Sequence, residues 1–302
     1  MDEDRKRIFT LDFVKDRIDN LPLIPFVVEQ LSTLSHDAID FYSKVAELAE
    51  QDPPLAAKVL SAAHRVPCGP LKPVYNIEKA LERMGVFNTL ALMQELTAVP
   101  VFEPTSPGHK IGWRHSLETA RFSRFLAQNT PGFNVSSDLA YMAGLLHDIG
   151  RFVLLQIAVK AVEVVDTKGW NSPEELSDVE QQTYGFTHAE VGYLAAQHWN
   201  LPRTLTSMLR LHHDYDLWRY DSVSVPFKQL LTIVQFADFL SVFLIKNPEW
   251  PAWSSTQLKG AICGFCIHKN WPEVDFPVDK LVAQLPAISE QCQAVLLKAG
   301  TA

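Results

Sequence analysis

Cysteine is scarce in this sequence, with only four among 302 residues. A chain of this length with so few cysteines is not held together by a disulfide framework. The first ten residues, MDEDRKRIFT, include early acidic residues and lack the apolar stretch of a signal peptide. No segment approaches the roughly 18 consecutive apolar residues of a membrane helix. These absences predict a cytoplasmic protein without a membrane partner.

An excess of positive charge is also lacking. The formal net charge is −8, and lysine and arginine form no block. Nucleic acid and anionic membrane surfaces are therefore not expected as partners. A phosphate-bearing substrate would need local cations or a metal ion to hold it. The composition is otherwise that of an ordinary globular protein, and the length allows two lobes.

Sustained alternation of apolar and polar residues, the pattern of a half-buried strand, does not occur. Helix signals are frequent instead. Asp52 followed by two prolines predicts a helix start. Asn76 is placed to cap a helix over 77–84, which Gly85 separates from the next one over 87–98. Further helices are predicted at approximately 112–128, 137–157, 158–167, 173–184, 188–199, 202–213, 227–246, 255–268 and 278–298. The predicted fold class is all-α.

Proline and glycine mark the clearest change in composition along the chain. Pro100, Pro104, Pro107 and Gly108 lie within nine residues. Segments of this kind commonly connect domains. We therefore predict a multi-helix bundle of two lobes, an N-terminal one over 1–105 and a C-terminal one over 106–302.

His147 and Asp148 are adjacent ionisable residues within the apolar sequence AGLLHDIGR. Buried ionisable groups are costly unless they are paired or bound to a metal. Gly144 and Gly150 flank the histidine at i−3 and i+3. Since glycine costs a helix about 1 kcal/mol against alanine, they predict that space is needed beside this imidazole. Arg151, at i+4, is expected to project on the same side.

Other histidines and an aspartate occur in comparable surroundings. His115 shares a predicted helix face with apolar residues, so it faces the core. His188 opens the capping box THAE, which places it in the first helical turn, where the helix dipole disfavours protonation. A neutral imidazole is the form that binds a metal. His212 and His213 close a predicted helix, and Asp238 has apolar neighbours on both sides.

Each of these histidines, taken alone, is best explained as a hydrogen-bonded core residue. Together, five histidines and two aspartates form a ligand set suited to Fe, Mn, Zn or Co. We predict that the chain binds one or two such divalent ions. The predicted ligands are His115, His147, Asp148, His188, His212, His213 and Asp238.

The order of these residues resembles the signature of the HD superfamily of metal-dependent phosphohydrolases. The N-terminal half is similar to a narrower family, the HDOD domains, through the sequences LPLIP, QDPPL and IEKALERMG. The similarity continues through the AGLLHDIGR and HAEVG sequences as far as the paired histidines. It covers approximately residues 15–240 and implies a C-terminal lobe of HD type.

The resemblance also implies roles for the candidate residues. One metal is expected on His115, His147, Asp148 and Asp238, with Asp148 bridging to a second metal on His188 and His212. Two ions about 3.5–4 Å apart would generate hydroxide from a bridging water for in-line attack on phosphorus. Three roles remain open for His213: a metal ligand, a residue that supports a ligand, or a contact to the substrate. Arg151 either neutralises a phosphate oxygen or has a structural role, on the helix surface or in an internal ion pair. The predicted catalytic residues are Asp148, Arg151 and His213.

The two resemblances imply different functions. HDOD proteins are typically bacterial signalling modules that have lost metal residues and are regarded as non-catalytic. Because every matched position is intact here, we favour hydrolysis of a phosphate ester or nucleotide. The alternative is a regulatory scaffold with a structural or sensory metal site and a signalling protein as partner. The Gly-Tyr-Pro element of the related HD-GYP proteins, which hydrolyse cyclic-di-GMP, is absent after His213. Cyclic-di-GMP is therefore not the expected substrate.

Two other features have simpler explanations. Cys263 and Cys266 have the C-x-x-C spacing, but no second pair completes a zinc site, so apolar packing is expected. Trp250, Trp253 and Trp271 are expected to pack the last helices onto the core. The alternative for these tryptophans is a partner surface.

Overall fold

The structure, a computed structural model, describes residues 10–18, 23, 25–66, 72–97 and 107–298. Within these ranges the regular structure is helical and no strand occurs, which confirms the predicted all-α class. The predicted lobe boundary at 105/106 lies outside the described residues. Most of the LPLIP sequence lies outside them as well.

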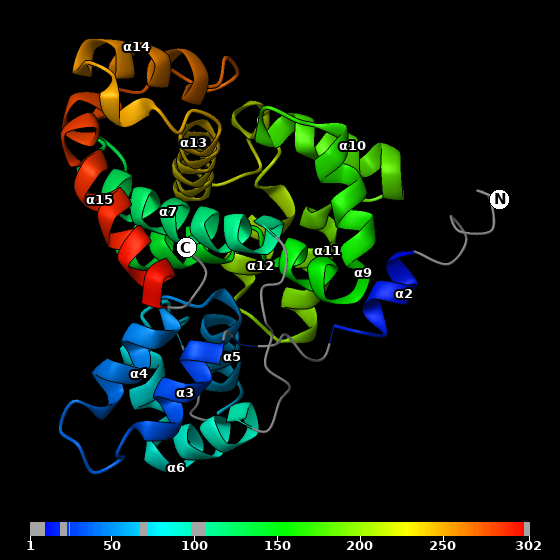
Figure 1. Cartoon of the computed structure of the whole chain (residues 1–302), viewed down its shortest axis with the longest axis vertical. Helices are drawn as coiled ribbons and strands as arrows, with labels where there is room; N and C mark the ends of the chain where they lie inside the picture. The colour runs from blue at the N-terminus through cyan, green and yellow to red at the C-terminus, as the bar shows by residue number, and fades with distance from the viewer. Residues whose placement is uncertain (1–9, 19–22, 24, 67–71, 98–106, 299–302) are drawn as a thin grey trace.

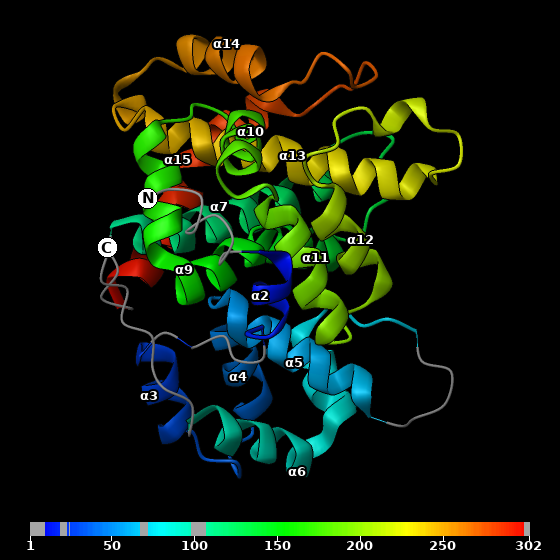
Figure 2. The same cartoon turned by 90° about the vertical axis from the view of Figure 1, so that its right-hand side faces the viewer.

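The N-terminal helices divide into a layer of α3 to α6, which lies below the rest of the molecule, and a short helix, α2, which packs beside the C-terminal helices (Figures 1 and 2). They are α2 (Leu11–Lys15), α3 (Pro25–Thr33), α4 (Phe41–Ala49), α5 (Pro53–Arg65) and α6 (Ile77–Thr97). The Asp52 carboxylate accepts a 2.8 Å hydrogen bond from the Leu55 N–H, and Asn76 caps α6 through the Lys79 N–H. Gly85, with φ of 72°, interrupts α6 where the sequence predicted a separation.

The C-terminal helices surround one buried helix, α13, almost all of whose residues between Lys228 and Leu244 are in the core. In order they are α7 (Pro107–Asn129), α8 (Ser137–Leu146), α9 (Ile149–Lys168), α10 (Pro173–Tyr184), α11 (His188–His198), α12 (Arg203–Leu211), α13 (Val225–Lys246), α14 (Ser255–Cys266) and α15 (Val278–Lys298). Short 3-10 turns lie at Leu217–Arg219 and Trp250–Ala252.

Two stretches are long and apolar enough to be tested as membrane spans, Ser137–Lys168 and Val225–Lys246. In the fold, 72% and 94% of their most apolar windows are buried against other helices. They are core helices of this fold.

Packing brings several helices together around the middle of this half. α7 packs on both α8 and α13, while α11 packs on α9 and α12. α15 and α14 cover the far side of α7 and α13 (Figure 1). The ends of α8 and α12 and the start of α11 therefore face the inner sides of α7 and α13.

Three predicted helix bounds are wrong, and two of the errors fall at candidate ligands. The helix predicted from 112 begins at Pro107. The helix predicted over 137–157 ends at Leu146, and a turn at His147 and Asp148 separates it from α9. The helix predicted over 202–213 ends at Leu211. Neighbouring side chains on an intact helix diverge by about 100°. Two adjacent residues can therefore point to one centre only where the helix ends, and the helix ends at both of these pairs.

Candidate metal centre

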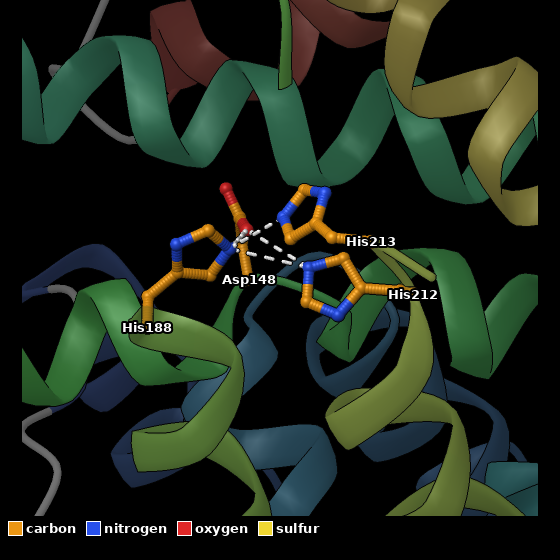
Figure 3. Close-up of side chains that lie close together, drawn as sticks. All are labelled: Asp148, His188, His212 and His213. Atoms are coloured by element: carbon orange, nitrogen blue, oxygen red, sulfur yellow. Dashed lines mark hydrogen bonds and ion pairs between the residues drawn. The ribbon is translucent and has the colours of Figure 1, made fainter. Parts of the chain in front are cut away.

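Seven side chains from five separate parts of the C-terminal half converge on one buried region. They form two groups, and within each group the potential ligand atoms all lie within 4.8 Å of one another. The first group is His115, His147 and Asp238; the second is Asp148, His188, His212 and His213. Figure 3 shows the second group, with the three imidazoles turned toward the Asp148 carboxylate. The structure thus brings together all the residues predicted as metal ligands.

The first group joins α7, the end of α8 and α13. His115 Nε2 lies 3.0 Å from His147 Nε2 and 3.2 Å from the Asp238 Oδ1. His147 Nε2 lies 3.9 Å from the same carboxylate oxygen. Metal bonds of about 2.0–2.2 Å place neighbouring donors of one ion roughly 3–3.5 Å apart. The spacing of this group fits such an ion.

The second group joins the start of α9, the start of α11 and the end of α12. His188 Nε2 lies 3.2 Å from His212 Nε2, 2.9 Å from His213 Nε2 and 3.0 Å from Asp148 Oδ1. These distances are again those of donors around one ion. His213, whose role the sequence left open, lies with this group.

Asp148 lies between the two groups. Its Oδ1 atom is 3.0 Å from His188 Nε2 and 3.6 Å from His147 Nε2. Its Oδ2 atom is 3.6 Å from His115 Nε2. Oδ1 therefore lies near ligands of both groups and Oδ2 near the first group, so this carboxylate is placed to reach an ion in either group.

The imidazoles of His147 and His212 are held from behind by backbone carbonyls. His147 Nδ1 donates to the Gly144 oxygen at 2.7 Å, and His212 Nδ1 donates to the Leu209 oxygen at 2.8 Å. A carbonyl can only accept, so the proton resides on Nδ1 and a neutral ring presents a lone pair at Nε2. This is the tautomer that binds a metal through Nε2.

His188 is held by a carboxylate that the sequence analysis missed. Its Nδ1 lies 2.6 Å from Glu180 Oε2, and the same oxygen accepts the His188 backbone N–H at 2.8 Å. A carboxylate behind a ligating histidine fixes the ring and raises its basicity. Glu180 is buried on the face of α10 that carries Leu176 and Pro173. An acidic residue on an apolar helix face was the signal available in the sequence.

His115 is held through a longer chain of hydrogen bonds. Its Nδ1 lies 3.0 Å from Ser241 Oγ, and that hydroxyl donates to Glu118 at 2.7 Å. Arg114 donates to the other oxygen of Glu118 at 2.8 Å. These residues were also missed, although Ser241 lies three positions after Asp238 on the same helix.

The electrostatics favour the neutral form of three of the five imidazoles, those of His147, His212 and His213. Burial also acts to lower the pKa of His115, but its hydrogen bond and charge contact with Asp238 outweigh burial and raise it. Burial, reinforced by the neighbouring imidazoles, keeps the pKa of His212 and of His213 well below the ordinary value. Burial also lowers the pKa of His147. Burial alone would raise the pKa of Asp148, but the adjacent His147 and His188 hold it well below its ordinary value. A bare carboxylate among neutral rings is what a divalent cation requires.

One electrostatic expectation from the sequence is wrong. The helix dipole was expected to keep His188 neutral, and burial acts in the same direction. Contacts with Glu180 and Asp148 instead raise the pKa of His188 to about 10. Carboxylates in direct contact outweigh the partial charge of a helix end. A metal ion at this position binds in competition with that proton.

The donor set fits a metal ion. His188 Nε2 and His212 Nε2 face each other at 3.2 Å. The same His188 nitrogen also lies 2.9 Å from His213 Nε2 and 3.0 Å from Asp148 Oδ1, and one proton on it can be donated to only one of these three atoms, so lone pairs of the other two remain turned toward a common point. A cation between the donors removes the repulsion between these lone pairs, and imidazole with carboxylate suits Fe, Mn, Zn or Co.

The glycines that flank His147 do not serve the purpose predicted for them. A Cβ at Gly144 would lie 2.7 Å from both Ser123 Oγ and the Thr119 oxygen on α7. A Cβ at Gly150 would overlap the His188 carbonyl oxygen. Both glycines therefore allow close helix packing, against α7 and α11, rather than clearing space for an imidazole. Gly150 in particular sets how closely the start of α11 approaches α9.

Arg151 is paired with carboxylates. Its guanidinium lies 2.9 Å from Asp166 and 3.5 Å from Glu180. Of the roles left open by the sequence, the internal ion pair is the one seen in the structure. Through Glu180, Arg151 also contacts the support of His188.

A cavity of about 520 Å³ opens onto the centre. Two ligands of each group line it: His115, Asp238, Asp148 and His213. The rest of its wall comes mainly from α7, α9, α10 and α13. The candidate centre is therefore accessible to a molecule much larger than water.

The remaining candidates behave as packing residues. Cys266 is buried, Cys263 is partly buried, and both are free thiols. Among the described residues no group of potential metal ligands includes a cysteine. Trp250 and Trp271 are buried against the core, as expected.

Comparison with solved structures shows the same fold in two proteins of known structure. The MmoQ response regulator from Methylococcus capsulatus strain Bath is 18% identical, over 82% of this chain and 94% of its own, with a TM-score of 0.60. A virulence factor from Campylobacter jejuni subsp. jejuni is 17% identical, over 93% and 96%, with a TM-score of 0.61.

Comparison of sequences identifies both a relative and a family. An uncharacterized protein of Treponema pallidum strain Nichols is 27% identical over 235 residues, which are 76% of this chain and 44% of that protein. The chain thus spans less than half the length of that relative. Residues 21–215 match the HDOD domain family. Because this match covers more than half of the chain, the protein belongs to the HDOD domain family.

Proposed function

We propose that this protein is a metal-dependent phosphohydrolase of HD type that acts on a phosphate ester or nucleotide. The observation that carries the proposal is the cavity of about 520 Å³ that reaches ligands of both groups. Structural metal sites are closed by protein ligands, whereas catalytic sites keep a position open to substrate. A maintained donor set beside an open cavity supports catalysis.

Each candidate residue has a role in this proposal. His115, His147 and Asp238 would hold one ion, and His188, His212 and His213 would hold another, with Asp148 reaching both. When bound, such ions supply Lewis-acid activation of water and stabilise charge on phosphate. Glu180 and Ser241 hold two of the imidazoles in orientation. Arg151 orients Glu180 rather than meeting phosphate directly.

A second candidate function is a signalling scaffold with a structural or sensory metal site. The observation that favours it is the pairing of Arg151 with Asp166 and Glu180, because an arginine bound to two carboxylates has little charge left to neutralise a phosphate group. In that case the N-terminal helices bind a signalling protein. Under both proposals the protein acts in the cytoplasm of a bacterium and has no nucleic-acid or membrane partner.

A hydrolase screen separates the two functions. The full chain, loaded in turn with Fe, Mn, Zn and Co, is assayed with phosphatase, phosphodiesterase and nucleotidase substrates. The proposal predicts turnover that falls by at least about a hundredfold in Asp148→Asn. Asp178→Asn, which changes an exposed carboxylate on α10, is the control and should keep full activity. No turnover by the fully metal-loaded chain on any substrate class would favour the scaffold.

A further inference from the structure

The cavity beside the candidate metal centre is lined by polar ligands at one end and by mainly apolar side chains farther along. On α13, Asp238, Val242 and Lys246 line it at successive turns. Eight residues of helix rise about 12 Å, so the cavity runs roughly that far from the ligands. A molecule bound there has one end at the metal ligands and the other near Lys246.

The middle of this cavity is apolar on several sides. Phe152, Leu155 and Val162 of α9 line one wall, and Val242 and Ile245 of α13 line another. Ile111 of α7 and Leu176 of α10 add to the same apolar section. The far end carries Trp170. These side chains offer no hydrogen bonds to sugar hydroxyls and favour the burial of hydrocarbon or an aromatic ring.

The cavity has little free positive charge away from the metal centre. Arg151 is neutralised by Asp166 and Glu180. Among the described residues of the lining, Lys246 is the one cation without a carboxylate partner, and its ammonium lies 4.4 Å from the Trp170 ring. Glu163 and Asp166 add negative charge to the wall. A second phosphate group would therefore lack a counter-charge within the apolar section.

We propose that the substrate is a phosphate monoester of an apolar alcohol, alkyl or aryl, whose organic group lies along this apolar section. The inference rests on the proposed function and specifies its substrate class. In the reaction, water forms a new P–O bond and the ester P–O bond breaks. A proton from water passes to the departing oxygen, which gives the free alcohol and inorganic phosphate without any oxidant or reductant.

A series of alkyl phosphates tests the proposal. The metal-loaded full chain is assayed with methyl, butyl and octyl phosphate, with glycerol phosphate as the polar comparison. Each methylene that becomes buried contributes about 0.8 kcal/mol, so kcat/KM should rise by roughly fourfold per methylene until the apolar section is filled. Glycerol phosphate should resemble methyl phosphate. Hydrolysis that is equally fast for all four esters would overturn the inference and leave the proposed function intact.

A matched pair of variants ties the effect to the cavity. Ile111 is 45% exposed and lines the cavity, while Val164 is 48% exposed on α9 and is not part of the lining. Ile111→Gln should lower the octyl-to-methyl ratio of kcat/KM by roughly three- to tenfold. Val164→Gln should leave that ratio unchanged. Equal effects of the two substitutions would contradict the assignment.

Binding measurements separate failure of this inference from failure of the proposed function. Octylphosphonate and methylphosphonate carry a P–C bond and are not hydrolysed, so their affinities for the metal-loaded chain are measured by calorimetry. Octylphosphonate should bind at least tenfold more tightly, and Ile111→Gln should reduce the difference. If no ester is hydrolysed but this preference is present, the proposed hydrolase function fails and the apolar specificity of the cavity stands. Equal affinities would overturn the apolar specificity.

Discussion

At the scale of single residues, the orientation of an imidazole in the candidate site depends on the group that is hydrogen-bonded to its Nδ1 atom. His147 and His212 use backbone carbonyls, whereas His188 uses the Glu180 carboxylate. A carbonyl remains in place when side chains change, so Glu180 is the support most open to a direct test. It also accepts the His188 backbone N–H, and it therefore fixes both the ring and the start of α11.

Glu180→Gln should weaken metal binding by the second group. The substitution keeps the shape and one acceptor oxygen but removes the negative charge that supports His188. Loss of such a support typically lowers metal affinity by about 10- to 100-fold. Calorimetric titration of the wild-type and variant chains with metal measures the change in affinity.

Asp178→Asn is the matched control for Glu180→Gln, because it removes an exposed carboxylate from the same helix. Its metal affinity should equal that of the wild type. Unchanged affinity in Glu180→Gln would show that the carboxylate does not support a ligand.

The candidate metal ligands could be predicted from the sequence, whereas the residues that hold those ligands in position could not. Histidine and aspartate in apolar surroundings are conspicuous, and all seven candidates lie together in the structure. Glu180, Glu118 and Ser241 are common residue types whose importance comes only from tertiary contacts. The pKa of His188 was mispredicted for the same reason, because its pairing with Glu180 on another helix is a tertiary contact.

At the scale of helices, the centre depends on interruptions and close contacts. Caps and proline–glycine signals predicted most helix ends within about two residues. The interruption at His147 and Asp148 was missed because the apolar pattern continues from α8 into α9 without a proline. The tertiary contacts of the two side chains, rather than local propensity, determine that turn.

Gly150→Ala tests the close approach of α9 and α11. The new Cβ would overlap the His188 carbonyl and lie 2.6 Å from the Gly192 nitrogen, and backbone atoms cannot move aside without shifting a helix. We expect a loss of about 1–3 kcal/mol in the free energy of unfolding, together with weaker metal binding because His188 is displaced. Denaturant unfolding and metal titration measure the two effects.

Gly260→Ala is the control for this helix contact. Gly260 is an exposed position within α14, and a Cβ there meets nothing within 4 Å. Since alanine favours a helix by up to about 1 kcal/mol over glycine, stability should be equal or higher. If Gly150→Ala behaves like Gly260→Ala, helix packing does not position His188.

At the scale of the whole molecule, the candidate centre links helices that are distant in sequence. His115 and Asp238 are separated by more than a hundred residues, yet they lie 3.2 Å apart. Helix periodicity and spacing predicted the helix order and the all-α class but not this contact, which was expected only from the resemblance to the HD superfamily. Ions bound to the two groups would together join α7, α11 and α13 with the ends of α8 and α12.

Metal binding should therefore stabilise the folded chain. A ligand that binds the native state alone adds about 2.7 kcal/mol at a free concentration of 100 times its Kd. Thermal unfolding of the full chain should show a higher Tm with Mn, Fe, Zn or Co than after chelation. Asp148→Ala should remove most of the difference, whereas Asp178→Asn should retain it. An equal Tm with and without metal would contradict this coupling.

The most direct test of the central claim is the metal content of the purified protein. The full chain is prepared without chelator, and its bound metals are identified and counted by elemental analysis, before and after incubation with Fe, Mn, Zn and Co. We predict one or two transition-metal ions per chain, with a clear loss in Asp148→Ala. A chain that is essentially free of transition metal and unable to take any up would contradict the account.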